Sequence, residues 1–142
     1  MIKLLESGRR EIPVPSFSHG DLEDLAHEAL GLESSRLAGA INIHDQPAKP
    51  LSKKYLKAKV KAGGQPVRDL YLTGNMLAAR TITDTGDKSV TIGFNDGLQY
   101  AKAAQNEKHE NMLGPSPNDT RHIDDRAHEI LHANIQILNE AK

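Results

Sequence analysis

Apolar residues recur every three to four positions in four segments of the chain, a spacing that predicts amphipathic helices. The first of these segments begins at Ser18 or Asp21, residue types that cap helices, and we expect it to end at Gly31. The side chains expected on its buried face are Leu22, Leu25, Ala26, Ala29 and Leu30. The pattern therefore indicates a helix that packs one side against a core.

Three more segments have helical spacing. Ser52 is expected to cap a helix that runs through Ala62 and ends at Gly63-Gly64, and residues 97–108 form another. After Pro115 and Pro117, a long C-terminal helix is expected to start at Asn118-Asp119. Its predicted buried stripe consists of Ile123, Ala127, Ile130, Leu131, Leu138 and Ala141.

Between these helices lies a segment with the composition of a β-hairpin. β-Branched residues at 81–83 and 90–92 flank a polar turn over residues 84–88 that contains Gly86. Strands and helices do not alternate as they would in a doubly wound sheet. The predicted fold class is α+β, with a small antiparallel sheet built around a central β-hairpin and packed with N-terminal, middle and long C-terminal helices. Residues 18–142 are expected to form one domain.

The first seventeen residues form a separate arm in this interpretation. Two short apolar pieces, 2–5 and 12–17, are separated by polar residues, and Pro13 and Pro15 keep the second piece extended. We expect residues 1–17 to act as an edge strand or a clasping arm that becomes ordered on assembly. Deletion of the arm is then expected to spare the folded domain.

Composition narrows the possible functions. The chain has 142 residues, and its 18 Lys and Arg nearly balance 19 Asp and Glu, so the whole chain does not have the charge of a polyanion binder. Only 37% of residues are hydrophobic and 4% aromatic, which predicts a thin core and favours stabilisation by neighbouring subunits. The chain has no Cys, which excludes disulfides, thiolate zinc sites and cysteine nucleophiles. No apolar stretch suggests a membrane span or a standard secretion signal.

One segment of the chain is strongly basic. Six cationic residues occur between positions 53 and 68 without an acidic residue among them: Lys53, Lys54, Lys57, Lys59, Lys61 and Arg68. Such a run is usually a solvated face, but it can also face a protein partner or neutralise the phosphates of a nucleic acid. A run without acids repels itself, so we expect these residues to meet a neighbouring subunit or a nucleic acid.

The C-terminal helix contains an H-E-x-x-H motif, in which two imidazoles one turn apart can bind zinc and a glutamate can activate water. The motif residues are His128, Glu129 and His132. A third ligand is not evident, because Ile135 and Leu138 stand where the extended motif requires Gly and His. The pattern favours an exposed polar face, with a zinc-dependent hydrolase as the alternative. No serine lies in a nucleophile signature, so no catalytic residue and no cofactor is assigned.

Several short blocks resemble the Mu-like tail-completion, or head-tail joining, proteins of the phage virion-morphogenesis family. They follow the family's order between residues 49 and 123. The blocks are Lys49-Pro50-Leu51-Ser52 with Tyr55 and Lys57, Leu72-Thr73-Gly74-Asn75-Met76-Leu77, Val90-Thr91-Ile92-Gly93, Tyr100-Ala101 with Gln105, and Met112-Leu113-Gly114-Pro115-Ser116 with Asp119 and Ile123. The sequence departs from the family at Ala104, where the family often has His, and at Glu107, where it has Gly.

The residues that carry this resemblance are expected to shape the fold. Thr73 is predicted to cap a short helix, Gly74 to permit a turn, and Tyr100 to bury its ring with its hydroxyl paired. Gly114, followed by proline, is predicted to redirect the chain. The residues assigned this role are Leu51, Thr73, Gly74, Tyr100, Gln105 and Gly114.

The resemblance implies a non-enzymatic structural protein of a tailed-phage virion that completes the tail and joins it to the head. Its expected partners are copies of itself in a ring, with six subunits as the expected number, head connector or adaptor proteins, and tail-tube or terminator proteins. DNA passing through the channel is a further expected contact, and a membrane is not. The expected location is the neck or tail end of the virion, reached from the host cytoplasm during assembly. The alternatives are the zinc-dependent hydrolase and a nucleic-acid-binding accessory protein.

Overall fold

The computed structural model describes residues 3–4, 10–11, 17–70 and 74–140. It has an α+β fold with a long C-terminal helix, as the sequence predicts. The elements in chain order are β1 (Lys3–Leu4), β2 (Arg10–Glu11), α1 (His19–Ala38), α2 (Lys53–Lys61), α3 (Asn75–Ala78), β3 (Arg80–Thr85), β4 (Val90–Phe94), α4 (Gly97–Glu107) and α5 (Pro117–Glu140). Strands β1 and β2 pair with each other in an antiparallel ladder within the predicted arm, and the rest of the arm up to residue 16 lies outside the described residues.

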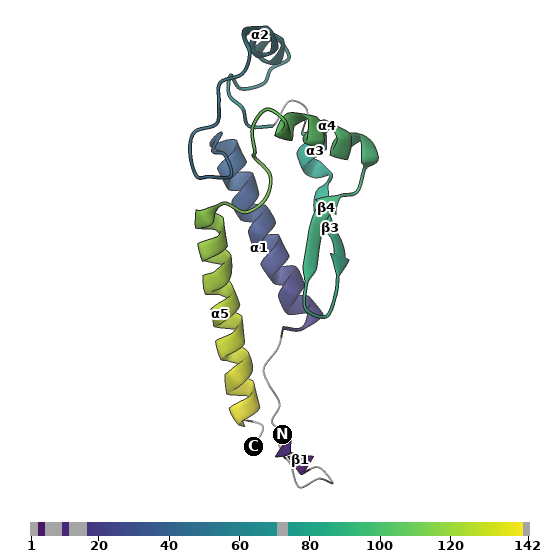
Figure 1. Cartoon of the computed structure of the whole chain (residues 1–142), viewed down its shortest axis with the longest axis vertical. Coiled ribbons are helices and arrows are strands. Elements are labelled where there is room, and N and C mark those ends of the chain that lie inside the picture. Colours follow the sequence, from purple (N-terminus) through teal and green to yellow (C-terminus); the bar gives the residue numbers. More distant parts are fainter. Residues whose placement is uncertain (1–2, 5–9, 12–16, 71–73, 141–142) are drawn as a thin grey trace.

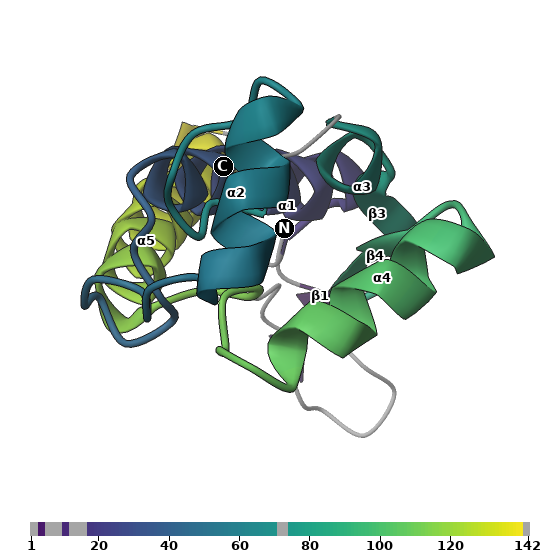
Figure 2. The same ribbon diagram turned by 90° about the horizontal axis from the view of Figure 1, so that it is seen from above.

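Helix α1 is the centre of the arrangement. The β3-β4 hairpin packs on one side of it, and α5 runs antiparallel to it on the other (Figure 1). Helices α3 and α4 cover the end of the hairpin near the C-terminus of α1, and α2 lies at the same end of the molecule (Figure 2). No helix in the described part of the chain has the length and apolar character that crossing a membrane requires.

The hydrophobic core is thin, as the composition predicts. Leu37 and Met112 are the large apolar side chains that are almost completely buried, at 1% and 0% exposure. The other buried apolar side chains in the described part of the chain are Leu22, Leu25, Ala26, Met76, Ala79, Ala103 and Ile130. A comparable number of polar and charged side chains is buried with them, so packing alone does not hold these elements together.

Helix α1 starts where the sequence predicts but continues further. The Ser18 hydroxyl accepts from the Asp21 backbone N–H at 3.0 Å, and the Asp21 carboxylate accepts from the Ser18 backbone N–H at 3.0 Å, which forms a capping box. The prediction that the helix ends at Gly31 is wrong, because it runs to Ala38. A glycine inside a helix costs only about 1 kcal/mol. The buried turn that follows, which includes Leu37, offsets that cost.

The predicted hairpin is confirmed, with longer strands and a shorter turn. Ile82 pairs with Ile92, and an irregularity at Thr83 shifts the register so that Asp84 pairs with Thr91. Asp84 and Thr85 therefore belong to β3 rather than to the predicted turn. The turn itself is closed by the Gly86 backbone N–H, which donates to the Ser89 carbonyl at 2.8 Å.

The other helices agree closely with their predicted bounds. Helix α2 is capped by the Ser52 hydroxyl and ends before Gly63, which has φ of +89°. The Asp96 carboxylate caps α4. On α5 the predicted stripe faces α1, but only Ile130 is buried; Ile123, Ala127, Leu131 and Leu138 are partly exposed, and Ala141 lies outside the described residues.

Candidate functional site

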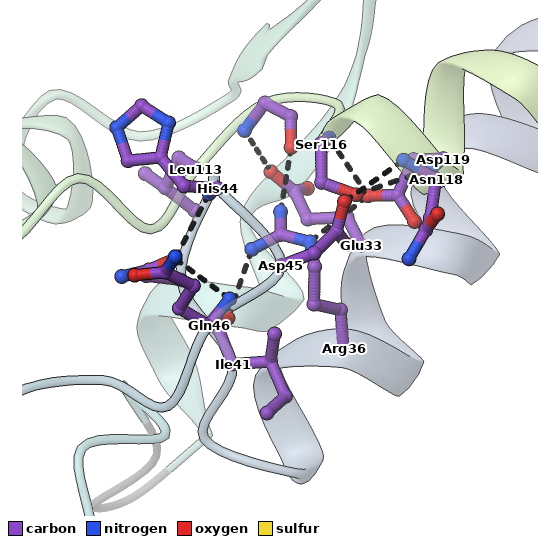
Figure 3. A network of polar contacts seen from close by, with 12 residues as sticks. Glu33, Arg36, Ile41, His44, Asp45, Gln46, Leu113, Ser116, Asn118 and Asp119 are labelled. Atoms are coloured by element: carbon purple, nitrogen blue, oxygen red, sulfur yellow. Dashed lines mark hydrogen bonds and ion pairs between the residues drawn. The ribbon is translucent and has the colours of Figure 1, made fainter.

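A buried arginine joins α1 to the loop that follows it and to the distant segment at the start of α5. The Arg36 Nε donates to the Asp119 carboxylate at 2.9 Å, and its two terminal nitrogens donate to the carbonyls of Ile41 and Gly114 at 3.0 and 2.6 Å (Figure 3). The side chains of Arg36 and Asp119 are only 5% and 8% exposed. A buried ion pair offsets its desolvation only when further hydrogen bonds satisfy both charges, and the guanidinium meets that condition here.

Glu33, one turn before Arg36, binds the hairpin and the loop that contains Gly114. Its carboxylate accepts two hydrogen bonds from Arg80, at 3.1 and 3.2 Å, and one from the Gly114 backbone N–H at 2.7 Å. Arg80 is the first residue of β3, and its guanidinium also lies over the Phe94 ring, 5.2 Å from the centroid. We call Glu33, Arg36, Arg80 and Asp119 the polar bracket, because together they connect α1, the hairpin and α5.

The start of α5 is fixed by a second capping box. The Ser116 hydroxyl accepts from the Asp119 backbone N–H at 3.1 Å, and the Asp119 carboxylate accepts from the Ser116 backbone N–H at 3.0 Å. Asp45 adds an acceptor for the Asn118 backbone N–H at 2.9 Å. The pKa of Asp45 lies below its ordinary value, chiefly because the Ser116 side chain hydrogen-bonds to its carboxylate, against a smaller opposing effect of desolvation.

The connection between α1 and α2 is held by a buried asparagine. The Asn42 side-chain oxygen accepts from the backbone N–H groups of His44 and Gln46, and its amide donates to the Glu110 carboxylate at 2.9 Å. Glu107 accepts from the backbone N–H groups of Met112 and Leu113 at 2.9 and 3.0 Å. Glu107, one of the departures from the family pattern, therefore fixes the loop that follows α4.

Two glycines of the resemblance sit where a positive φ is required. Gly74 is the N-cap of α3 with φ of +83°. Gly114, which is hydrogen-bonded to both Glu33 and Arg36 of the polar bracket, has φ of +101°. The predicted roles of both glycines in turning the chain are confirmed. Gly74 stands at the N-cap position of α3, and Thr73, which was predicted to cap this helix, lies outside the described residues.

The prediction that Tyr100 buries its ring is wrong. Tyr100 is 63% exposed on α4, and its ring makes an edge-to-face contact with the Phe94 ring, with the centroids 6.1 Å apart. Leu51 is partly buried and Gln105 is exposed, and both line a pocket described below. Tyr100 thus belongs to the surface, together with the neighbouring Leu98, which is also 63% exposed.

The basic run is divided by the fold into exposed and buried members. Arg68 is partly buried and donates to the carbonyls of Lys49 and Pro50, so it braces the connection before α2. The four exposed members, which we call the α2 lysines, are Lys53, Lys54, Lys57 and Lys61.

Lys59 contradicts the prediction that the whole run faces a partner. Its side chain is 2% exposed, and its ammonium pairs with the Asp69 carboxylate and donates to the Val67 carbonyl at 2.6 Å. Gly64 makes room for this side chain, since a Cβ there would lie 2.7 Å from the Lys59 Cγ. Lys59 therefore ties α2 to the segment that follows it.

The H-E-x-x-H residues lie exposed on α5. The Glu129 carboxylate accepts from Arg126 at 3.0 Å, and His132 Nε2 lies 3.4 Å from the Gln136 amide nitrogen. His128 is exposed on the same helix. Within the described ranges, no three or more His, Asp or Glu side chains are grouped so that they could hold a metal ion.

A pocket of about 540 Å³ opens between α2, α4 and the segment around Met76. This volume is typical of ligand-binding pockets. Gln99 is 8% exposed in its wall, and its side-chain oxygen has no hydrogen-bond partner. Besides Gln105, the lining includes Leu51, Tyr55, Arg68, Met76, Gln99 and Lys102.

Sequence reasoning missed the polar bracket and Gln99. Glu33, Arg36 and Asp119 occur among other charged residues on predicted helices, and nothing local distinguishes them from solvent-facing positions. One local signal was present, because Ser116 and Asp119 have the spacing of a capping box. Comparisons with protein-family models, curated proteins and solved structures found no match to this chain.

Proposed function

We propose that this chain is a structural protein of a tailed-phage virion, which completes the tail and joins it to the head as one subunit of a neck ring. The observation that carries the proposal is the ordered set of sequence blocks between residues 49 and 123. Two of those blocks contain the glycines at which the chain turns, and a third block supplies β4. The blocks thus specify the path of the backbone, as expected for a fold whose task is assembly.

The hairpin offers a means of contact between subunits. In the described part of the chain, β3 and β4 pair only with each other, so each has one edge with backbone groups that a neighbouring subunit can bind. Exposed apolar side chains on α4 and α5 add further surface for such contacts. A thin core combined with these open surfaces supports a role in which neighbouring subunits contribute to stability.

The α2 lysines are the part of this surface that fits a polyanion or an acidic protein. Reversal of three of them, Lys53→Glu, Lys54→Glu and Lys57→Glu, is expected to weaken assembly and to leave the thermal midpoint of the monomer nearly unchanged. Normal assembly combined with a lower midpoint would instead assign these residues to the fold. Strong salt-dependent binding of duplex DNA by the purified chain would favour the nucleic-acid-binding alternative.

Electron microscopy of particles made without this protein tests the proposal. Filled heads and finished tails are expected to accumulate separately, and the purified protein is expected to let them join. Empty heads, or tails of uncontrolled length without a joining defect, would assign the protein to another step. The zinc-hydrolase alternative requires close to one equivalent of bound zinc that is lost in the variant His128→Ala, His132→Ala. We expect the purified chain to bind no such zinc, and we expect particles with this variant to keep nearly unchanged infectivity.

A further inference from the structure

The lining of the pocket beside α2 combines apolar and basic side chains. Leu51, Tyr55 and Met76 supply apolar surface, and Lys102 and Arg68 supply positive charge. None of the described residues that line it is acidic. The buried Gln99 oxygen adds an acceptor without a partner, which a donor on an occupant would satisfy. The pocket therefore fits a segment that carries an apolar side chain, a carboxylate and a hydrogen-bond donor.

The end of α5 presents these three groups on one exposed face. Ala133, Gln136, Ile137 and Glu140 are separated by three or four residues, so they form one stripe, which we call the α5 tip. Ile137 is 63% exposed, so its apolar surface is available to a partner. An adjacent side of the helix faces α1, where Asn134 donates to the Asp21 carboxylate at 3.4 Å.

The pocket and the α5 tip cannot meet within one molecule. Helices α2 and α4 lie at one end of the chain, and the last turn of α5 lies at the other (Figure 1). We propose that the pocket receives the α5 tip of a second copy, with Ile137 against Leu51 and Met76, Glu140 beside Lys102, and the Gln136 amide donating to the Gln99 oxygen. This is the arrangement of a helix in a groove, with apolar anchors at helical spacing.

Because the pocket and the tip are different surfaces, the contact is heterologous and each subunit uses both. Such contacts close into a ring when the rotation between subunits permits it. The inference thus names the subunit contact of the ring and rests on the proposed function for its biological setting. The association itself is a property of the purified chain and is tested separately.

Cysteine cross-linking measures the contact directly, since the chain has no cysteine of its own. In the full chain with Gln105→Cys and Ala133→Cys, one cysteine lines the pocket and the other lies on the α5 tip. Mild oxidation is expected to give disulfide-linked dimers and higher species on a non-reducing gel. The control combines Ala133→Cys with Lys88→Cys, which is exposed near the hairpin turn. We expect at least a tenfold higher yield of linked species than in this control.

Charge reversal in the same double-cysteine chain tests the pairing. Lys102→Glu alone and Glu140→Lys alone are each expected to lower the cross-linking yield, and the two together are expected to restore it. Yields equal to the Lys88→Cys control, or no restoration in the combined variant, would overturn the proposal and assign the pocket to another acidic partner. The neck proposal would still be decided by microscopy of the particles, so the two failures are distinguishable.

Discussion

Arg36 and Asp119 lie 83 positions apart in the chain and form a buried ion pair at 2.9 Å. The same guanidinium holds the carbonyls of Ile41 and Gly114, so one side chain fixes the end of α1, the loop after it and the start of α5. The polar bracket gives this junction a defined geometry. The orientation of α5 against α1 therefore depends on Arg36.

We expect Arg36→Met to lower the free energy of unfolding by about 3 to 5 kcal/mol, because the Asp119 carboxylate loses its buried cation. The matched control is Arg126→Met, which removes an exposed ion pair with Glu129 and is expected to change stability by less than about 1 kcal/mol. Urea denaturation of both variants measures the difference. Equal effects of the two substitutions would show that the bracket does not stabilise the fold.

The sequence predicted the elements whose signals are local. Ser18 and Ser52 cap helices as expected, and the hairpin pairs in the expected order because its strands are only a few residues apart. The end of α1 was missed because Gly31 is a local stop signal, whereas the contacts that extend the helix come from residues far along the chain. Local patterns contain no information about such partners.

The same limit applies to the candidate site. Lys59 cannot be told apart from its neighbouring lysines by pattern, and its burial depends on Asp69, which follows a double-glycine turn. Gln99 is one polar residue among several on α4. The pocket exists only because α2, α3 and α4 come together at one end of the molecule, which no single helix predicts.

Lys59→Met is expected to lower the free energy of unfolding by about 3 kcal/mol, because the Asp69 carboxylate loses the buried ammonium beside it. Lys57→Met, on the same helix but exposed, serves as the control and is expected to change stability by at most about 0.5 kcal/mol. Thermal and urea unfolding of the two variants give the comparison. If Lys59→Met leaves the free energy of unfolding unchanged, Lys59 behaves like the exposed lysines of the basic run.

Gly114→Ala is expected to destabilise the chain by about 1 to 2 kcal/mol, because its φ of +101° disfavours an L side chain. The new Cβ would also lie 3.4 Å from the Ile43 Cδ1. Gly97→Ala is the matched control: it starts α4 with open space around a Cβ, and we expect a gain of about 0.4 to 1 kcal/mol. Denaturant unfolding measures both changes. A lower midpoint for Gly114→Ala and a higher midpoint for Gly97→Ala, each with an unchanged slope, would confirm the prediction.

The stability of the chain is expected to depend on the ionisation of Asp45. The pKa of its carboxyl in the folded chain lies below the ordinary value of 3.8, first because of the Ser116 hydrogen bond. The folded state therefore holds this proton less tightly than the unfolded chain. The stabilisation is complete well above pH 3.8 and is lost as the pH falls through the lower, folded pKa.

Asp45→Asn should accordingly lower the thermal midpoint at pH 7, and the difference from the unsubstituted chain should shrink below about pH 3.8. Asp124→Asn, at an exposed position on α5, is the control and is expected to leave the midpoint at pH 7 nearly unchanged. A difference for Asp45→Asn that stays constant from pH 7 to pH 2 would mean that the carboxylate charge does not contribute to the start of α5.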